Sequence, residues 1–245
     1  MRVLFLFLVV LVVSCRTENY SAIEEDSLYH DLQRLSKEEF RQSYKSLLQR
    51  MDVKRGKLLK RYNNPANSGT LELTKTFLYQ TLTDSLFQFW YDTPWDFNGV
   101  TEVPGEGNIA CGYFVTTTLQ QAGYTIDRVY LAQQAASVII NTLCNPSEVK
   151  IFTNGKRDGL KKYLLARPNS LYILGLDSHV GFVQKKDTMI YMIHSSGFSP
   201  WKVVCESFEN CAAIQHSQFF MIGDLLNNQE SVLKWLKKER IEVRK

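Results

Sequence analysis

The stretch that decides the fold is residues 179–195, HVGFVQKKDTMIYMIHS. Its two apolar halves flank a short polar link, as in two antiparallel strands joined by a hairpin turn. We place the centre of the turn between Lys186 and Asp187. This register predicts that His179 and His194 are direct cross-strand neighbours on one face of the sheet, with Cβ atoms about 4.5–5.5 Å apart.

The rest of the chain divides into a helical part followed by a strand-rich part. Helices are expected over 36–62, 71–91, 111–122, 127–143, 158–166 and 223–238, and short strands over 171–176, 179–184, 189–195, 201–204 and 219–222. The first helix opens on Ser36 and Glu39, which have the spacing of a capping box. Helices first and strands later predict an α+β fold with a mostly antiparallel sheet.

The composition is that of an ordinary globular protein. Of the 245 residues, 44% are apolar, 22% charged and 12% aromatic, which excludes a disordered, collagen-like or disulfide-miniprotein chain. The net charge is +4, and the 29 basic residues are interleaved with 25 acidic ones. We therefore expect no nucleic-acid partner, and a monomer with one sizeable core plus an extension.

The amino end indicates export from the cytoplasm. Met1-Arg2 precedes an apolar run over 3–13, which as a helix spans about 16 Å, only half of a bilayer core. The run and the Ser14-Cys15 pair that follows resemble a bacterial lipoprotein signal, so we expect residues 1–14 to be removed and Cys15 to carry a lipid anchor. The alternative is an ordinary signal peptide cleaved nearby. Residues 15–35 are interpreted as a tether, and the protein is placed in the cell envelope.

Cys111 stands out among the cysteines because it follows a glycine-containing loop and opens the predicted helix 111–122, which Gly123 ends. Free N–H groups and partial positive charge at a helix amino end favour a thiolate, so we expect the thiol pKa to lie below its reference value. The same N–H groups suit an oxyanion hole. The alternative is a buried structural cysteine.

Two adjacent imidazoles suit a general base and the group that orients it, so His179 and His194 complete a candidate site with Cys111. Two surface histidines on a hairpin are the simpler alternative. A zinc site with Cys205 or Cys211 would need ligand pairs such as CxxC or HExxH, which are absent from the sequence, so no metal is expected. Cys205 and Cys211 lie six residues apart and are either a small disulfide loop or two thiols.

Four motifs in order resemble the NlpC-type cysteine peptidases, papain-fold endopeptidases of the bacterial cell wall. They are TPWDFNG at 93–99, ACGYFV at 110–115, HVGFV at 179–183 and IHSS at 193–196. The resemblance implies a papain-like catalytic domain over 93–245, with residues 36–92 as a helical extension packed on the sheet.

The resemblance also implies roles for individual residues. Cys111 would be the nucleophile, His179 the base and His194 the orienting residue, with no cofactor and with a peptide bond of cell-wall stem peptides as substrate. Apart from the resemblance, nearby residues are candidates for binding the oxyanion or the substrate, namely Trp95, Asp96, Gly112 and Tyr113. The alternatives are that Asp96 caps a turn and that the aromatic rings belong to the core.

Departures from the family pattern leave other functions open. The family has Asp where this chain has Ala110, Ser where it has Gly112, and an oxyanion-assisting Tyr where it has Trp95. One alternative is a non-catalytic module that binds the cell wall or a protein. Another is an amidase or acyltransferase that acts on a different secreted substrate.

Overall fold

The computed structural model describes residues 27–154 and 156–244. The predicted signal peptide, 1–14, and the predicted lipidation site, Cys15, lie outside these residues. Within the described ranges, no helix combines the length and the apolar character needed to cross a membrane.

The predicted tether, 15–35, is wrong at its carboxyl end. Residues Ser27–Leu32 form helix α1, in which Leu32 is buried. The ring of Tyr29 packs edge-on against Tyr91, with centroids 5.8 Å apart, and its hydroxyl donates a hydrogen bond to Asp92. These apolar contacts fix the segment on the globular body.

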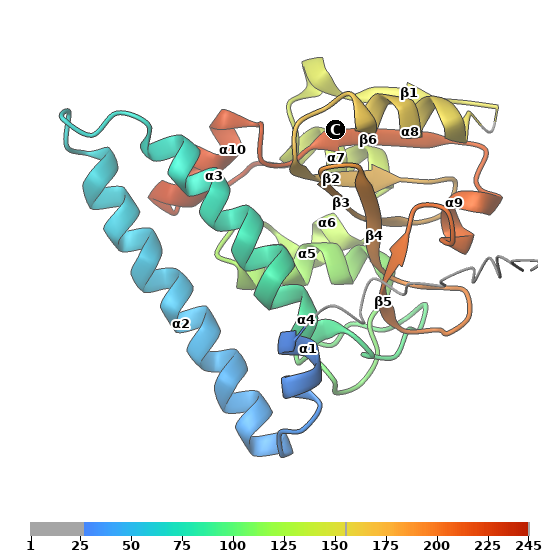
Figure 1. Cartoon of the computed structure of the whole chain (residues 1–245), viewed down its shortest axis with the longest axis horizontal. Helices are drawn as coiled ribbons and strands as arrows, with labels where there is room; N and C mark the ends of the chain where they lie inside the picture. Colours follow the sequence, from blue (N-terminus) through green and yellow to red (C-terminus); the bar gives the residue numbers. More distant parts are fainter. Residues whose placement is uncertain (1–26, 155, 245) are drawn as a thin grey trace, which may run out of the picture.

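The centre of the fold is a six-stranded sheet in which every neighbouring pair is antiparallel (Figure 1). The strand order is β1-β6-β2-β3-β4-β5. The strands are β1 (Lys150–Phe152), β2 (Ser170–Gly175), β3 (Val180–Lys186), β4 (Met189–Ser195), β5 (Val203–Ser207) and β6 (Phe220–Asp224). The predicted α+β class with an antiparallel sheet is confirmed.

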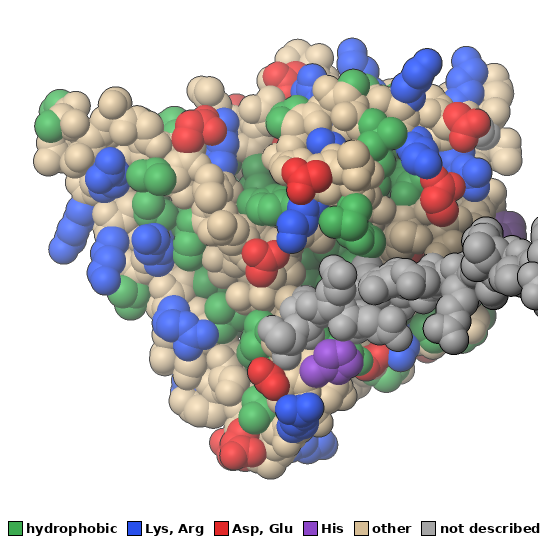
Figure 2. All heavy atoms as spheres, in the orientation of Figure 1, with side chains coloured by type: hydrophobic (Ala, Val, Ile, Leu, Met, Phe, Trp, Pro, Cys, Tyr) green, Lys and Arg blue, Asp and Glu red, His purple; other side chains and the backbone are tan. Residues whose placement is uncertain are grey.

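The amino-terminal helices lie side by side along one flank (Figure 1). Helix α2 (Lys37–Tyr62) begins with the predicted capping box of Ser36 and Glu39. Helix α3 (Thr70–Thr81) continues through a π-helical turn, η1 (Leu82–Leu86), into α4 (Phe87–Trp90). The outer edge of α2 carries exposed basic side chains, which Figure 2 shows facing solvent. They are Lys45, Arg50, Lys54, Lys57 and Lys60.

The remaining helices are short. They are α5 (Cys111–Gln121), α6 (Arg128–Ala132), α7 (Ala136–Leu143), the 3₁₀ turn η2 (Pro146–Glu148), α8 (Arg157–Leu165), α9 (Ala212–His216) and α10 (Gln229–Lys237). The single helix predicted over 127–143 is wrong, because residues 133–135 separate α6 from α7. The final helix starts later than predicted, because β6 runs on through Asp224 and Asn228 caps α10.

Apolar side chains fill both faces of the sheet. One cluster joins the amino-terminal helices to the sheet, and the rings of Phe87 and Phe182 lie 4.8 Å apart within it. A second cluster lies on the opposite face around Tyr172, Val183 and Phe208. Because the first cluster contains side chains from both sides of the predicted boundary at 92/93, the helical extension and the sheet share one core.

The predicted register of the hairpin is wrong by two residues. Val183 pairs with Met192 rather than with Ile190, because the turn is Asp187-Thr188 and Lys186 pairs with Met189. Asp187 takes the left-handed backbone conformation, with φ 54°, that this tight turn requires. A slip of two residues leaves every side chain on its predicted face, whereas a slip of one would have reversed it.

Candidate active site

Three polar side chains form a diagonal row across strands β3, β4 and β5. His179 precedes β3, and its Nε2 lies 2.7 Å from Nδ1 of His194 on β4. The other nitrogen of His194, Nε2, lies 2.8 Å from Oε2 of Glu206 on β5. The shifted register makes these neighbours diagonal rather than directly opposite, which is still within reach of long side chains.

Gly181 leaves the space that this row needs. A Cβ atom at position 181 would lie 2.7 Å from Cβ of His194 and 2.9 Å from the methyl carbon of Met192. Since Gly181 is the second residue of β3 and shares the face of His179, its missing side chain allows the two imidazoles to meet. The His194 side chain is fully buried, and that of Glu206 is 21% exposed.

Burial, together with the neighbouring His194, lowers the pKa of His179 well below its usual value. The ring therefore rests neutral, as a general base must. A carboxylate only accepts hydrogen bonds, so a neutral His194 donates Nε2–H to Glu206 and accepts at Nδ1. The proton on His179 is then on Nε2, and the lone pair on its Nδ1 is free to take a proton.

Cys111 is the first residue of α5 and is half-buried. Burial raises the pKa of its thiol, and hydrogen bonds from the main-chain N–H groups of Val180, Gly112 and Cys111 itself oppose the rise. The predicted N–H groups are thus present at the sulfur, but the predicted lowering of the pKa is wrong, because loss of water outweighs them.

The residues that follow His179 and His194 in the sequence contact the chain around Cys111. The main-chain N–H of Val180, next to His179, lowers the pKa of the Cys111 thiol and so lies near the sulfur. The hydroxyl of Ser195, next to His194, donates to the carbonyl of Ile109 at 2.6 Å. The sulfur thus meets the sheet at the amino end of β3. Among the described residues, the imidazoles hydrogen-bond each other, Glu206 and Cys211 rather than the Cys111 sulfur, so proton transfer to His179 stays a prediction.

We expect Cys111 to react slowly with iodoacetamide at neutral pH, because the thiolate is the reactive form and burial raises the pKa of the thiol. The rate of alkylation should rise only as the pH passes that raised value. Mass spectrometry of the Cys111 peptide across a pH series measures this rate, with the urea-unfolded protein as reference. A fast reaction below about pH 7 would instead reveal a thiolate–imidazolium pair.

Gly112 is required by close packing. A Cβ atom at this position would lie 2.3 Å from the main-chain oxygen of Ala132, at the end of α6. The departure from the family pattern, Gly in place of Ser, therefore has a steric cause in this fold.

Trp95 lies close to the segment that precedes Cys111. It forms a parallel bridge with Ile109, and its ring centroid is 5.4 Å from that of Trp201. The indole edge also packs on Gly197. Trp201 is 53% exposed, so its ring extends the surface beside Trp95, and its backbone has the left-handed conformation, with φ 57°. An oxyanion role for the Trp95 indole stays a prediction.

The other predicted substrate residues are engaged locally. Asp96 accepts a hydrogen bond from the N–H of Asn98 at 2.7 Å and so closes a turn. Tyr113 accepts from Gln133 at 3.1 Å, and the guanidinium of Arg128 lies 5.0 Å from the centroid of its ring. These contacts place both side chains in the packing around the site.

Glu206 was missed in the sequence, whereas Cys211 was placed with the histidines there only as one possible ligand of a zinc site. The predicted strand 201–204 stops too early, whereas β5 reaches Ser207 and puts Glu206 on the face of His194. Cys211, which precedes α9, has its sulfur 3.8 Å from His194 Nε2. Neither Cys205 nor Cys211 is in a disulfide. The sequence signal that could have revealed Glu206 is an acidic residue within an otherwise apolar strand.

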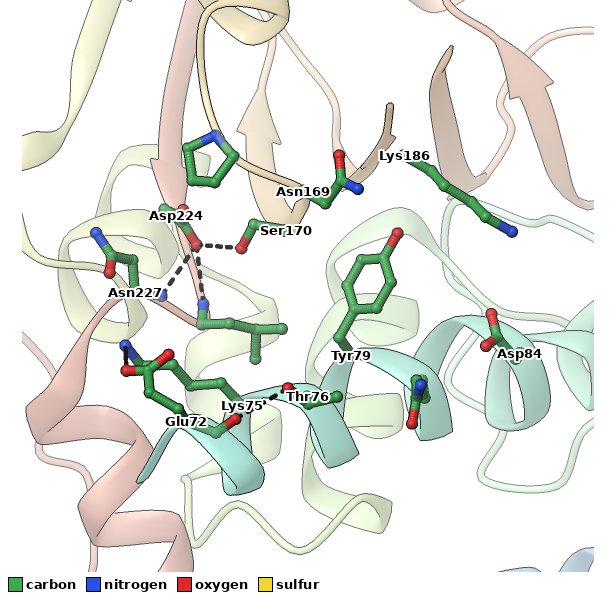
Figure 3. Close-up of a pocket in the computed structure, with 13 residues that line it drawn as sticks. Glu72, Lys75, Thr76, Tyr79, Asp84, Asn169, Ser170, Lys186, Asp224 and Asn227 are labelled. Carbon is green, nitrogen blue, oxygen red and sulfur yellow. Dashed lines mark hydrogen bonds and ion pairs between the residues drawn. The ribbon is translucent and has the colours of Figure 1, made fainter. Parts of the chain in front are cut away.

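A separate cavity of about 470 Å³ lies between α3 and the ends of the strands (Figure 3). Asp224 lines it and accepts hydrogen bonds at Oδ1 from the Ser170 hydroxyl and from the N–H groups of Leu226 and Asn227. Burial raises the pKa of Asp224. The residues that line this cavity do not include the row of His179, His194 and Glu206.

Comparisons with known proteins give no family assignment, because no protein-family model, curated protein or solved structure matches this chain. The resemblance to NlpC-type peptidases therefore rests on its four motifs and remains a prediction.

Proposed function

We propose that the protein is a cysteine hydrolase of papain-like, NlpC-type fold, which cleaves an amide bond through Cys111, His179 and His194. The observation that carries the proposal is the hydrogen-bonded row from His179 through His194 to Glu206. The row begins beside Val180, whose main-chain N–H lowers the pKa of the Cys111 thiol. A row of this kind fixes the tautomer of a general base.

The reaction would begin as the Cys111 sulfur attacks the carbonyl carbon and its proton passes to Nδ1 of His179. Main-chain N–H groups at the start of α5 would stabilise the oxyanion. The His179 imidazolium would then give its proton to the departing amine, while Glu206 balances its charge through His194. Water would finally cleave the thioester and restore the thiol.

The proposed substrate is a peptide bond in cell-wall stem peptides, on the strength of the four motifs. The proposed setting is the cell envelope, with the chain anchored through a lipid on Cys15. Exposed aromatic rings beside the segment that precedes Cys111, Phe97 at 80% and Trp201 at 53%, support an extended substrate surface there.

The test is release of stem peptides from purified cell wall. Wild-type protein should liberate new amino groups, identified by mass spectrometry of the soluble fragments, and Cys111→Ala should release none above the buffer control. Equal release by both proteins would contradict the proposal.

A binding module on the same scaffold is the second candidate, favoured by the raised pKa of the Cys111 thiol and by Ala110 in place of the family's Asp. This candidate predicts that wild type and Cys111→Ala sediment equally with purified cell wall, while neither protein releases peptide.

Glu206 is proposed as a positioning residue, which acts through His194. Glu206→Ala would remove the acceptor for a buried N–H, and loss of a hydrogen bond of this kind should lower kcat by about 10- to 100-fold with little change in KM. Glu206→Gln keeps a carbonyl oxygen in place and should retain most of the activity. If both variants lose equal activity, or if KM changes instead of kcat, Glu206 does not act by orienting the base.

A further inference from the structure

Three side chains that can bind a metal ion lie together at the end of the row, away from His179. His194, Glu206 and Cys211 offer one nitrogen, one oxygen and one sulfur, and these three atoms all lie within 4.8 Å of one another. His194 and Cys211 are buried, whereas Glu206 is part-exposed and connects the cluster with solvent.

The separations suit a small tetrahedral metal ion. Nε2 of His194 lies 2.8 Å from the Glu206 oxygen and 3.8 Å from the Cys211 sulfur. Bonds of about 2.0–2.3 Å at tetrahedral angles place neighbouring ligand atoms about 3.3–3.7 Å apart. Small side-chain movements therefore convert the hydrogen-bonded cluster into a coordination shell.

We propose that His194, Glu206 and Cys211 form a site for a divalent zinc-like ion, with water as the fourth ligand. Zn²⁺ is the ion that a mixed set of imidazole, carboxylate and thiolate favours. Binding would release the Cys211 thiol proton to solvent. It would also shift the proton of His194 from Nε2 to Nδ1, so that the Nε2 lone pair binds the metal in place of the hydrogen bond to Glu206.

Occupation of this site would switch off the hydrolase, a consequence that rests on the proposed function. With the metal on Nε2, the proton of a neutral His194 lies on Nδ1, which must then donate to Nε2 of His179. His179 in turn carries its proton on Nδ1, where the base needs a lone pair. The metal thus reverses the direction of the hydrogen bond between His194 and His179 without contacting Cys111.

The site is tested first by binding alone. In full-length Cys111→Ala protein, which has no candidate nucleophile, added Co²⁺ should give one equivalent of thiolate-to-cobalt charge-transfer absorption, and Zn²⁺ should displace it. Cys211→Ala in that background should remove this absorption and weaken Zn²⁺ binding by about 100-fold. Cys205→Ala, one residue from Glu206 on the opposite face of its strand, is the matched control and should bind as before.

Because Cys211 is buried, Cys211→Ser provides a second variant, and both variants are checked for a cooperative thermal transition. Absence of the absorption in the parent protein, or its persistence in folded Cys211→Ala, would overturn the site. The second experiment measures hydrolysis. Zn²⁺ should inhibit the wild-type enzyme, and half-inhibition of Cys211→Ala should need at least a tenfold higher Zn²⁺ concentration. If no hydrolysis is found in any variant, the proposed function fails while the cobalt measurement still decides the metal site.

Discussion

Cys111→Ala is expected to lower kcat/KM for amide hydrolysis by about four to six orders of magnitude, because none of the other proposed catalytic residues can form the thioester. His179→Ala should have an effect of similar size, since a thiol with a raised pKa needs a base at neutral pH. The measurement is the initial rate of amine release with saturating and limiting substrate.

The double variant gives a sharper test of the same mechanism. If Cys111 and His179 act as one unit, the pair of substitutions should cost no more than Cys111→Ala alone, because groups that work together are not additive. Fully multiplicative losses would mean that the two residues act independently, and the proposed proton transfer between them would be wrong. Ser196→Ala, outside the row, serves as the control for general damage to the site.

Gly112→Ser is expected to destabilise the fold by about 2–3 kcal/mol, although it restores the residue of the family pattern. The new Cβ would lie 2.3 Å from the carbonyl oxygen of Ala132, a main-chain atom that cannot rotate away. For a protein of this size, the thermal midpoint should fall by roughly 4–12 °C.

The matched control for this substitution is Gly56→Ser on α2. A Cβ at position 56 meets no atom within 4 Å, so that variant should unfold near the wild-type temperature. Differential scanning calorimetry compares the two. A Gly112→Ser protein as stable as wild type would show that the start of α5 and the end of α6 are free to separate.

Local signals in the sequence predict the elements whose stability is local. The capping box of Ser36 and Glu39 correctly places the start of α2, and Gly123 adopts the predicted left-handed conformation with φ 101° after α5. Alternation along 179–195 predicts the correct face for both histidines. These features depend on neighbours within a few residues of one another.

Features that depend on distant contacts were not predictable in the same way. Both candidate turns in the hairpin are polar, so composition alone does not distinguish a turn at Lys186-Asp187 from one at Asp187-Thr188. Glu206 joins His194 only through the pairing of β4 with β5. The pKa of the Cys111 thiol depends on burial, which the position at a helix end does not reveal.

The core shared by the amino-terminal helices and the sheet determines which part of the chain can fold by itself. Phe182, one residue on from Gly181, packs against Phe87 from the amino-terminal helices. A fragment that starts at Thr93 would leave that ring facing water on the side where the helices now lie. We therefore expect the proposed catalytic residues to fold correctly in another polypeptide only when α2, α3 and α4 are transferred with them.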